Sequence, residues 1–289
     1  MSATPAELDP PAAPAAAVPV RPWGRWGLRG VAVIYLGLMI VLPLSALLGE
    51  GLGGGPAAFW RDVTSPLALA ALRLTLGAAV VMTAINTLMG TLTAYVLVRY
   101  RFPGRGLLNG LVDLPFAVPT LVTGIMLVML YGPQRALGAW LAARGLEVIF
   151  APPGIVLALL FVTYPFVVRA VQPVLEEIDQ AQEEAAATLG ASQWATFLQV
   201  ILPAIAPAMI TGALLSFARA LGEFGSLVIV AGNIPGRTLT APVYIYGEVE
   251  SQHQRGASAM SILLLALSFG LMLFVDWLQQ RKGGARVTG

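Results

Sequence analysis

The chain contains no cysteine and only one histidine, His253. Without thiols it has no disulfide, no thiolate metal site and no cysteine nucleophile, and a single histidine argues against a transition-metal centre built from protein ligands. The same scarcity argues against an intramembrane protease, because a Ser–His pair or an H-E-x-x-H motif needs histidine inside the membrane. Asp113 with Asp276 as a catalytic pair has no supporting motif. Asp and Glu could still hold a hard cation. No motif in the sequence points to a catalytic residue, a metal or a cofactor, and we expect none of the three.

Charged side chains are also scarce. They make up 11% of the 289 residues, whereas hydrophobic residues make up 57% and the mean hydropathy is +0.78. Soluble domains carry roughly 25% charged residues. Several apolar runs approach the roughly 20 residues that an α-helix needs to cross a bilayer, and a β-barrel would instead read as short alternating segments. The composition predicts an all-α integral membrane protein in contact with lipid. The net charge of +2, on scattered bases, argues against a nucleic-acid partner.

Six transmembrane helices are expected within residues 28–280, because that many long apolar runs occur there. They cover residues 28–48, 67–98, 107–131, 155–171, 203–231 and 257–278. Residues 1–27, rich in Pro and Ala, are expected to form a disordered tail, and residues 281–289 a basic tail.

The distribution of basic residues predicts the orientation, because cytoplasmic ends of spans carry more Lys and Arg. One side has ten: Arg21, Arg25, Arg29, Arg99, Arg101, Arg105, Arg169, Arg281, Lys282 and Arg286. The other has five: Arg61, Arg135, Arg144, Arg237 and Arg255. Both termini are therefore expected in the cytoplasm, together with residues 172–202.

Polar and helix-breaking residues inside the spans are candidates for function. Pro115 and Pro119 interrupt the third span; either they make ordinary kinks or this span lines a passage in which freed carbonyls are satisfied. Asp113 precedes them and either caps freed amides or faces a wet passage.

Arg219 and Glu223 lie four residues apart in the fifth span, hence on one helix face. They are either a self-neutralising buried pair or part of a passage or subunit interface, where Gly222 and Gly225 would allow close backbone approach. Arg73, near a span end, is expected to reach the membrane surface.

The connection between the fourth and fifth spans is acidic. Five carboxylates lie within residues 176–184, and no base lies between Arg169 and Arg219. The pattern predicts two short helices separated by Gly190, with Ser192 capping the second and an apolar stripe from Trp194 to Ile201. The segment either lies on the membrane or docks on a protein that offers arginines. The second is favoured, because surface helices on anionic lipid are normally basic.

The stretch EAAATLGASQWATFLQVILP, residues 184–203, resembles the EAA loop of ABC-importer permeases. Glu184-Ala185-Ala186, Gly190 and Leu202-Pro203 match in register, and Val200 replaces the family's isoleucine. The resemblance implies that residues 176–203 form a coupling segment that inserts into a groove on an ATP-hydrolysing subunit. The docking residues it implies are Glu183, Glu184, Ala185, Ala186, Gly190, Trp194, Phe197, Leu202 and Pro203.

Four further segments, RYRFPGR, DLPFAVPT, YPFVVRAVQPVLEE and FARALGEFGSLVIVAGNIPGRT, are similar to the T-type permease of sulfate/thiosulfate importers. Molybdate permeases share some of them, so a molybdate or tungstate importer is the alternative. The resemblance implies a non-catalytic permease subunit in the cell (inner) membrane. It implies as partners a second permease subunit, an ABC ATPase dimer that holds ATP and Mg, and an extracytoplasmic sulfate-binding protein.

The candidate residues for the translocation path or subunit interface are Asp113, Pro115, Pro119, Arg219, Gly222, Glu223 and Gly225. A secondary transporter that uses Asp113, Arg219 and Glu223 for proton coupling is a rival hypothesis, against which the EAA match argues. The chain has no P-loop motif, so it is not expected to hydrolyse ATP itself.

Overall fold

The computed structural model describes residues 22–283, and all regular secondary structure in that range is helical. The chain divides into two units, residues 1–46 and 47–289. The first contains α1 (Pro22–Leu36), the π-helical turn η1 (Gly37–Val41) and the start of α2 (Leu42–Leu52). Because α1 begins at Pro22, the last residues of the expected disordered tail are helical. The rest of that tail, and the end of the expected basic tail, lie outside the described residues.

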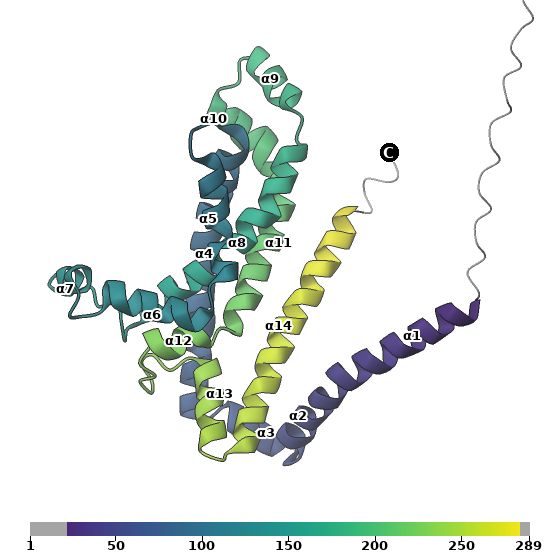
Figure 1. The fold of residues 1–289 in the computed structure, drawn as a ribbon, viewed down its shortest axis with the longest axis vertical. Helices are drawn as coiled ribbons and strands as arrows, with labels where there is room; N and C mark the ends of the chain where they lie inside the picture. The colour runs from purple at the N-terminus through teal and green to yellow at the C-terminus, as the bar shows by residue number, and fades with distance from the viewer. Residues whose placement is uncertain (1–21, 284–289) are drawn as a thin grey trace, which may run out of the picture. The chain divides into compact units, whose positions relative to one another are not determined.

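The second unit contains the remaining helices (Figure 1). They are α3 (Gly55–Val63), α4 (Pro66–Arg99), α5 (Arg105–Ala117), α6 (Thr120–Tyr131), α7 (Ala136–Ala142), α8 (Pro152–Glu177), α9 (Gln180–Thr188), α10 (Gln193–Thr196), η2 (Phe197–Ile201, π-helical), α11 (Leu202–Leu221), α12 (Gly225–Val230), α13 (Ala241–Glu250) and α14 (Gln254–Gly283).

Five stretches of the described chain are long and apolar enough to cross a membrane, or six if α5 and α6 form one broken span. This agrees with the six expected spans, but two of them differ in detail. The third is bent by 111° between α5 and α6. Val118 adopts an extended conformation before Pro119, as the residue before a proline prefers, and this ends α5. The fifth span is not one helix through residue 231, because α11 ends at Leu221 and α12 starts afresh at Gly225.

The core of the second unit lies where α4, α8 and α11 cross. Small residues let these helices approach closely: a Cβ added at Gly90 of α4 would lie 2.9 Å from Val167 Cβ, and one at Gly212 of α11 would lie 2.9 Å from Val167 Cα. Close contact at small residues drives helix association in membranes. Val167 of α8 is therefore held between the two neighbouring helices.

A buried polar cluster joins the same three helices. Asn86 Nδ2 of α4 donates to Thr163 Oγ1 at 2.9 Å and to the Leu160 carbonyl at 3.1 Å, and Ser216 Oγ of α11 donates to the Thr163 carbonyl at 3.1 Å. The side chains of Asn86, Thr163 and Ser216 are almost fully buried. Buried polar groups cost free energy unless they are paired, so this cluster fixes how α4, α8 and α11 are aligned.

The second unit places different elements at its two ends (Figure 1). The short helices α9 and α10 lie at one end, and α3, α13 and the start of α14 lie at the other. Between them α6 packs along α12, where a Cβ on Gly124 would come within 2.8 Å of the Ser226 carbonyl oxygen.

Candidate functional site

The acidic connection forms two short helices with a glycine turn, as the sequence predicts. Asp179 caps α9, since its Oδ1 accepts a hydrogen bond from Ala181 N at 2.9 Å. Gly190 follows with φ +84°, a left-handed conformation that favours glycine. Ser192 Oγ then accepts from Ala195 N at 3.2 Å and caps α10, which continues through η2 into α11.

The apolar residues of this segment divide between the core and the surface. Ile201 is 1% exposed and, with Phe197, packs in the cluster that joins α4, α8 and α11. Trp194 is 69% exposed although its ring stacks on Phe197 with centroids 5.8 Å apart, and Leu189, beside the glycine turn, is 88% exposed. The expected single stripe is therefore half buried, because its C-terminal part runs straight into α11. Leu202 and Pro203 begin that helix.

The carboxylates of the segment have different environments. Glu183 lies 2.6 Å from Arg99 Nη2, in the last turn of α4, and its side chain is 23% exposed. The partner of Glu183 is thus an arginine of the same chain. The sequence did not point to it, because Arg99 lies on another helix, far from the acidic stretch. Glu184, Ala185 and Gly190 are exposed, and Ala186 is half-buried.

Asp113 pairs with Arg169 and thereby links α5 to α8. Arg169 Nε donates to Asp113 Oδ1 at 2.7 Å and Nη2 to Oδ2 at 2.5 Å, which is a bidentate geometry. The other donors go to Asn109 Oδ1, the Asn109 carbonyl and Gln172 Oε1, at 2.9, 2.9 and 2.6 Å. Five donor contacts match the five N–H groups of a guanidinium. Asp113 is engaged with a side chain rather than with freed backbone amides.

Pro115 and Pro119 lie on either side of the bend between α5 and α6. Pro115 lines a cavity of about 550 Å³ between α4, α5, α6 and α8, together with Met89, Leu127 and Phe161. The walls of this cavity are mainly apolar, so it does not resemble a site for an anion. Pro119 occupies the position before α6.

Arg219 and Glu223 form an ion pair at 2.8 Å, with Glu223 1% exposed and Arg219 34% exposed. The second carboxylate oxygen of Glu223 accepts from Ser226 N and from Ser226 Oγ, both at 2.9 Å. Glu223 therefore neutralises Arg219 and also satisfies the first turn of α12, where backbone N–H groups have no helical partner. Within this chain the pair is self-neutralising, one of the two expected arrangements.

The two glycines beside this pair behave differently. A Cβ on Gly225 would collide with Thr120 Oγ1, so Gly225 permits the contact between α12 and α6. A Cβ added at Gly222 would have no described neighbouring atom within 4 Å. The expected close approach is therefore present at Gly225 and absent, within the described chain, at Gly222.

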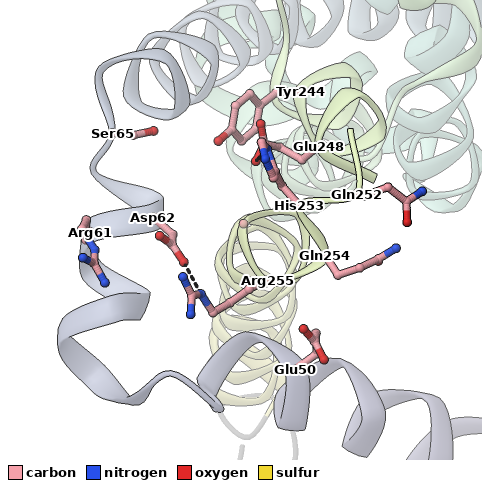
Figure 2. Close-up of a pocket in the computed structure, with 11 residues that line it drawn as sticks. Glu50, Arg61, Asp62, Ser65, Tyr244, Glu248, Gln252, His253, Gln254 and Arg255 are labelled. Carbon is pink, nitrogen blue, oxygen red and sulfur yellow. Dashed lines mark hydrogen bonds and ion pairs between the residues drawn. The ribbon is translucent and has the colours of Figure 1, made fainter. Parts of the chain in front are cut away.

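The sequence did not indicate a polar pocket of about 680 Å³ (Figure 2), which is lined by residues of α3 and α13 at the end opposite α9 (Figure 1). In it Arg255 Nε lies 3.1 Å from Asp62 Oδ2, and His253 Nδ1 lies 3.7 Å from Glu248 Oε2. Burial raises the pKa of Tyr244, another lining residue. These residues come from α3, α13, the connection after α13 and the start of α14, so no local pattern in the sequence joins them. Across the described part of the chain, no group of three or more His, Asp and Glu side chains could hold a metal.

A bundle of long apolar helices, with a polar pocket at one end and an exposed helix–glycine–helix segment at the other, is the architecture of a multi-pass membrane protein. Comparison with known proteins makes this specific. Residues 86–284 match the family model described as binding-protein-dependent transport system inner membrane component. The chain belongs to this family, the non-catalytic membrane components of ABC transporters.

Individual relatives cover most of the chain. The "Probable sulfate transport system permease protein cysT" of Nephroselmis olivacea is 44% identical over 254 residues, or 88% of each chain. The "Sulfate transport system permease protein CysT" of Escherichia coli is 42% identical over 90% of this chain and 94% of the relative. A chain of a solved bacterial alginate ABC transporter superposes with a TM-score of 0.74 at 18% identity, over 90% of this chain and 94% of that chain, which shows a shared fold.

Proposed function

We propose that this chain is one of two permease subunits of an ATP-driven sulfate/thiosulfate importer, which moves the anion across the cell (inner) membrane. Relatives named as sulfate transport permeases, 42–44% identical over most of the chain, support the substrate class. A relative from Synechocystis named "Sulfate transport system permease protein CysW" is 39% identical, which supports a second, similar permease as partner. Both termini lie in the cytoplasm, as the distribution of basic residues predicts.

The observation that carries the coupling part of the proposal is the exposed segment α9–Gly190–α10. Its Trp194 and Leu189 leave large apolar surfaces uncovered at the end where the EAA residues lie. A groove on an ATPase subunit would cover them, with Glu184 facing a base. ATP binding then closes the ATPase dimer, and α5, α6, α8 and α11 rock between two forms. ATP must bind more tightly to one of the two forms, because a ligand that binds both equally does not change the equilibrium between them.

The charges of the spans support a passage without a tight anion site. The N–H groups of Arg169 donate hydrogen bonds to Asp113, Asn109 and Gln172, and the charge of Arg219 is neutralised by Glu223. A tetrahedral dianion needs free donors to bind tightly. Selection of the anion then belongs to an extracytoplasmic binding protein, which would approach the end of the molecule that carries the polar pocket. ATP and Mg bind the partner ATPase, and this chain holds no cofactor.

The substrate is tested by ATPase stimulation. The chain is co-purified with its associated subunits, and binding protein loaded with sulfate, thiosulfate, molybdate or tungstate is added. We expect sulfate and thiosulfate to stimulate ATP hydrolysis. Stimulation by molybdate or tungstate alone would replace the substrate assignment with the alternative oxyanion importer.

The docking role is tested by charge reversal. Glu184→Lys is expected to release the ATPase subunit during purification while membrane insertion is unchanged. Glu177→Lys is the matched control, because it reverses an exposed charge of the same acidic stretch outside the EAA residues. Retention of the ATPase subunit by Glu184→Lys would remove Glu184 from the docking surface.

A further inference from the structure

The coupling helix α9 has few attachments to the rest of the second unit. None of its residues is buried. Among the described residues, one ion pair joins its side chains to another helix, and that is the contact between Glu183 and Arg99. By contrast, the neighbouring η2 segment is anchored by Phe197 and Ile201 in the core cluster. The position of α9 relative to the spans therefore depends on Glu183, Arg99 and the chain connections at its two ends.

The ion pair between Arg99 and Glu183 is close and largely buried, and it has one nitrogen–oxygen contact. Arg99 Nη2 lies 2.6 Å from Glu183 Oε1, and the two side chains are 9% and 23% exposed. Arg99 Nε, Arg99 Nη2 and Glu183 Oε1 have no hydrogen-bond partner in the described chain, so the contact is a close ion pair through one nitrogen without hydrogen-bond geometry. Burial lowers screening and strengthens the attraction between the charges.

Both charges also suit their places in the helices. Arg99 lies in the last turn of α4, and Glu183 in the first turn of α9. The C-terminus of a helix favours a cation and the N-terminus an anion. Tyr95, one turn before Arg99, contacts Phe197 of η2 with ring centroids 5.5 Å apart. The end of α4 is thus held to both parts of the connection, through Arg99 to α9 and through Tyr95 to η2.

From Arg99, α4 runs back into the core. Asn86 and Gly90 of α4 contact α8 at the crossing described above. A displacement of α9 would therefore reach the spans by two routes. One is the continuous chain through α10 and η2 into α11, and the other is the ion pair into α4.

We propose that Arg99 is a positioning residue that ties the coupling helix α9 to α4, so that movement of the docked segment displaces α4 together with α11. This deepens the proposed function and rests on it for the role in transport. The position of α9 on α4, however, is a property of this chain and is testable without any partner.

The first test measures the position of α9 directly. Because the chain has no cysteine, Leu88→Cys on α4 and Gln182→Cys on α9, both exposed positions, can carry a pair of spin labels in the full-length protein. We expect Arg99→Gln to broaden the distance distribution, and the charge exchange R99E/E183R to narrow it again. Arg101→Gln, which removes an exposed arginine two residues away, is the control and should change nothing. An unchanged distribution in Arg99→Gln would overturn the proposal.

The second test measures coupling in the assembled complex. With the ATPase subunit retained, Arg99→Gln is expected to raise the ATP hydrolysed per anion transported several-fold, while Arg101→Gln matches the wild type. The same ratio in Arg99→Gln and wild type would refute the role of Arg99 in transmission. If the wild-type complex shows no ATP-driven transport, the proposed function fails, and the spin-label distances still decide whether Arg99 positions α9.

Discussion

Replacing Glu223 tests whether one carboxylate holds the junction between α11 and α12. In Glu223→Ala, Arg219 loses its partner and Ser226 loses the acceptor for both its N–H and its hydroxyl. Arg219 is 34% exposed and can turn toward solvent, so the loss of its partner should cost little free energy of unfolding. Ser226 is fully buried and cannot be rescued by solvent in the same way.

The magnitude follows from these differences in burial. Leaving a buried donor unsatisfied costs about 1–3 kcal/mol, and measured interhelical hydrogen bonds in membranes average only about 0.6 kcal/mol. For the two Ser226 donors we expect a total of about 2–4 kcal/mol. At about 2–4 °C per kcal/mol for a chain of this size, the thermal midpoint of the full chain in detergent should fall by about 4–16 °C. Intrinsic fluorescence during heating measures it.

Glu223→Gln separates the two roles of this carboxylate. It keeps an oxygen that can accept from Ser226 and removes the charge opposite Arg219, so its cost should be about 1 kcal/mol. Glu147→Gln is the control, because it breaks an exposed ion pair with Arg237 whose side chains are 66% and 57% exposed, and it should be nearly neutral. If Glu223→Gln is as damaging as Glu223→Ala, the ion pair and not the capping of α12 dominates, and the reasoning is refuted.

Three other changes have expected outcomes. Gly225→Ala should lower the thermal midpoint because its Cβ meets Thr120, whereas Gly222→Ala should not, and equal effects would contradict the packing of α6 on α12. Arg169→Ala should cost about 1–2 kcal/mol after allowance for partial exposure, and the double variant with Asp113→Ala should cost less than the two single changes together, as thermal unfolding can show. Gly190→Ala places a Cβ at φ +84° and should cost about 1–2 kcal/mol locally; faster hydrogen exchange in residues 180–201 would report it, and unchanged exchange would count against the turn.

The sequence predicted the helices and the exposed connection well, because long apolar runs, Ser192 as a cap and Gly190 as a stop are local signals. The 111° bend was not predictable in size. Pro119 indicates that a helical hydrogen bond is missing and that Val118 prefers an extended conformation, but it does not set the angle. We attribute the angle to the packing of α6 on α12 through Gly124 and Gly225. This packing joins residues about a hundred positions apart in the sequence.

The partners of the ion pairs were the second feature that could not be predicted from the sequence. Glu183 and Asp113 stood out in the sequence as unusual carboxylates, yet their partners, Arg99 and Arg169, belong to other helices and follow only from the tertiary structure. The pair of Arg219 and Glu223 was predictable because it lies within one helical turn. The second role of Glu223, as the acceptor for Ser226, was hidden by the break between α11 and α12.

The most direct measurement of the central claim is sulfate uptake by the complex reconstituted in sealed vesicles. Radiolabelled sulfate is supplied with its binding protein on one side, with ATP on the other, and the proton gradient is clamped. Uptake that requires ATP, and that Glu184→Lys abolishes, is the predicted result. Uptake that continues without ATP and follows an imposed proton gradient instead would show a secondary transporter and contradict the account.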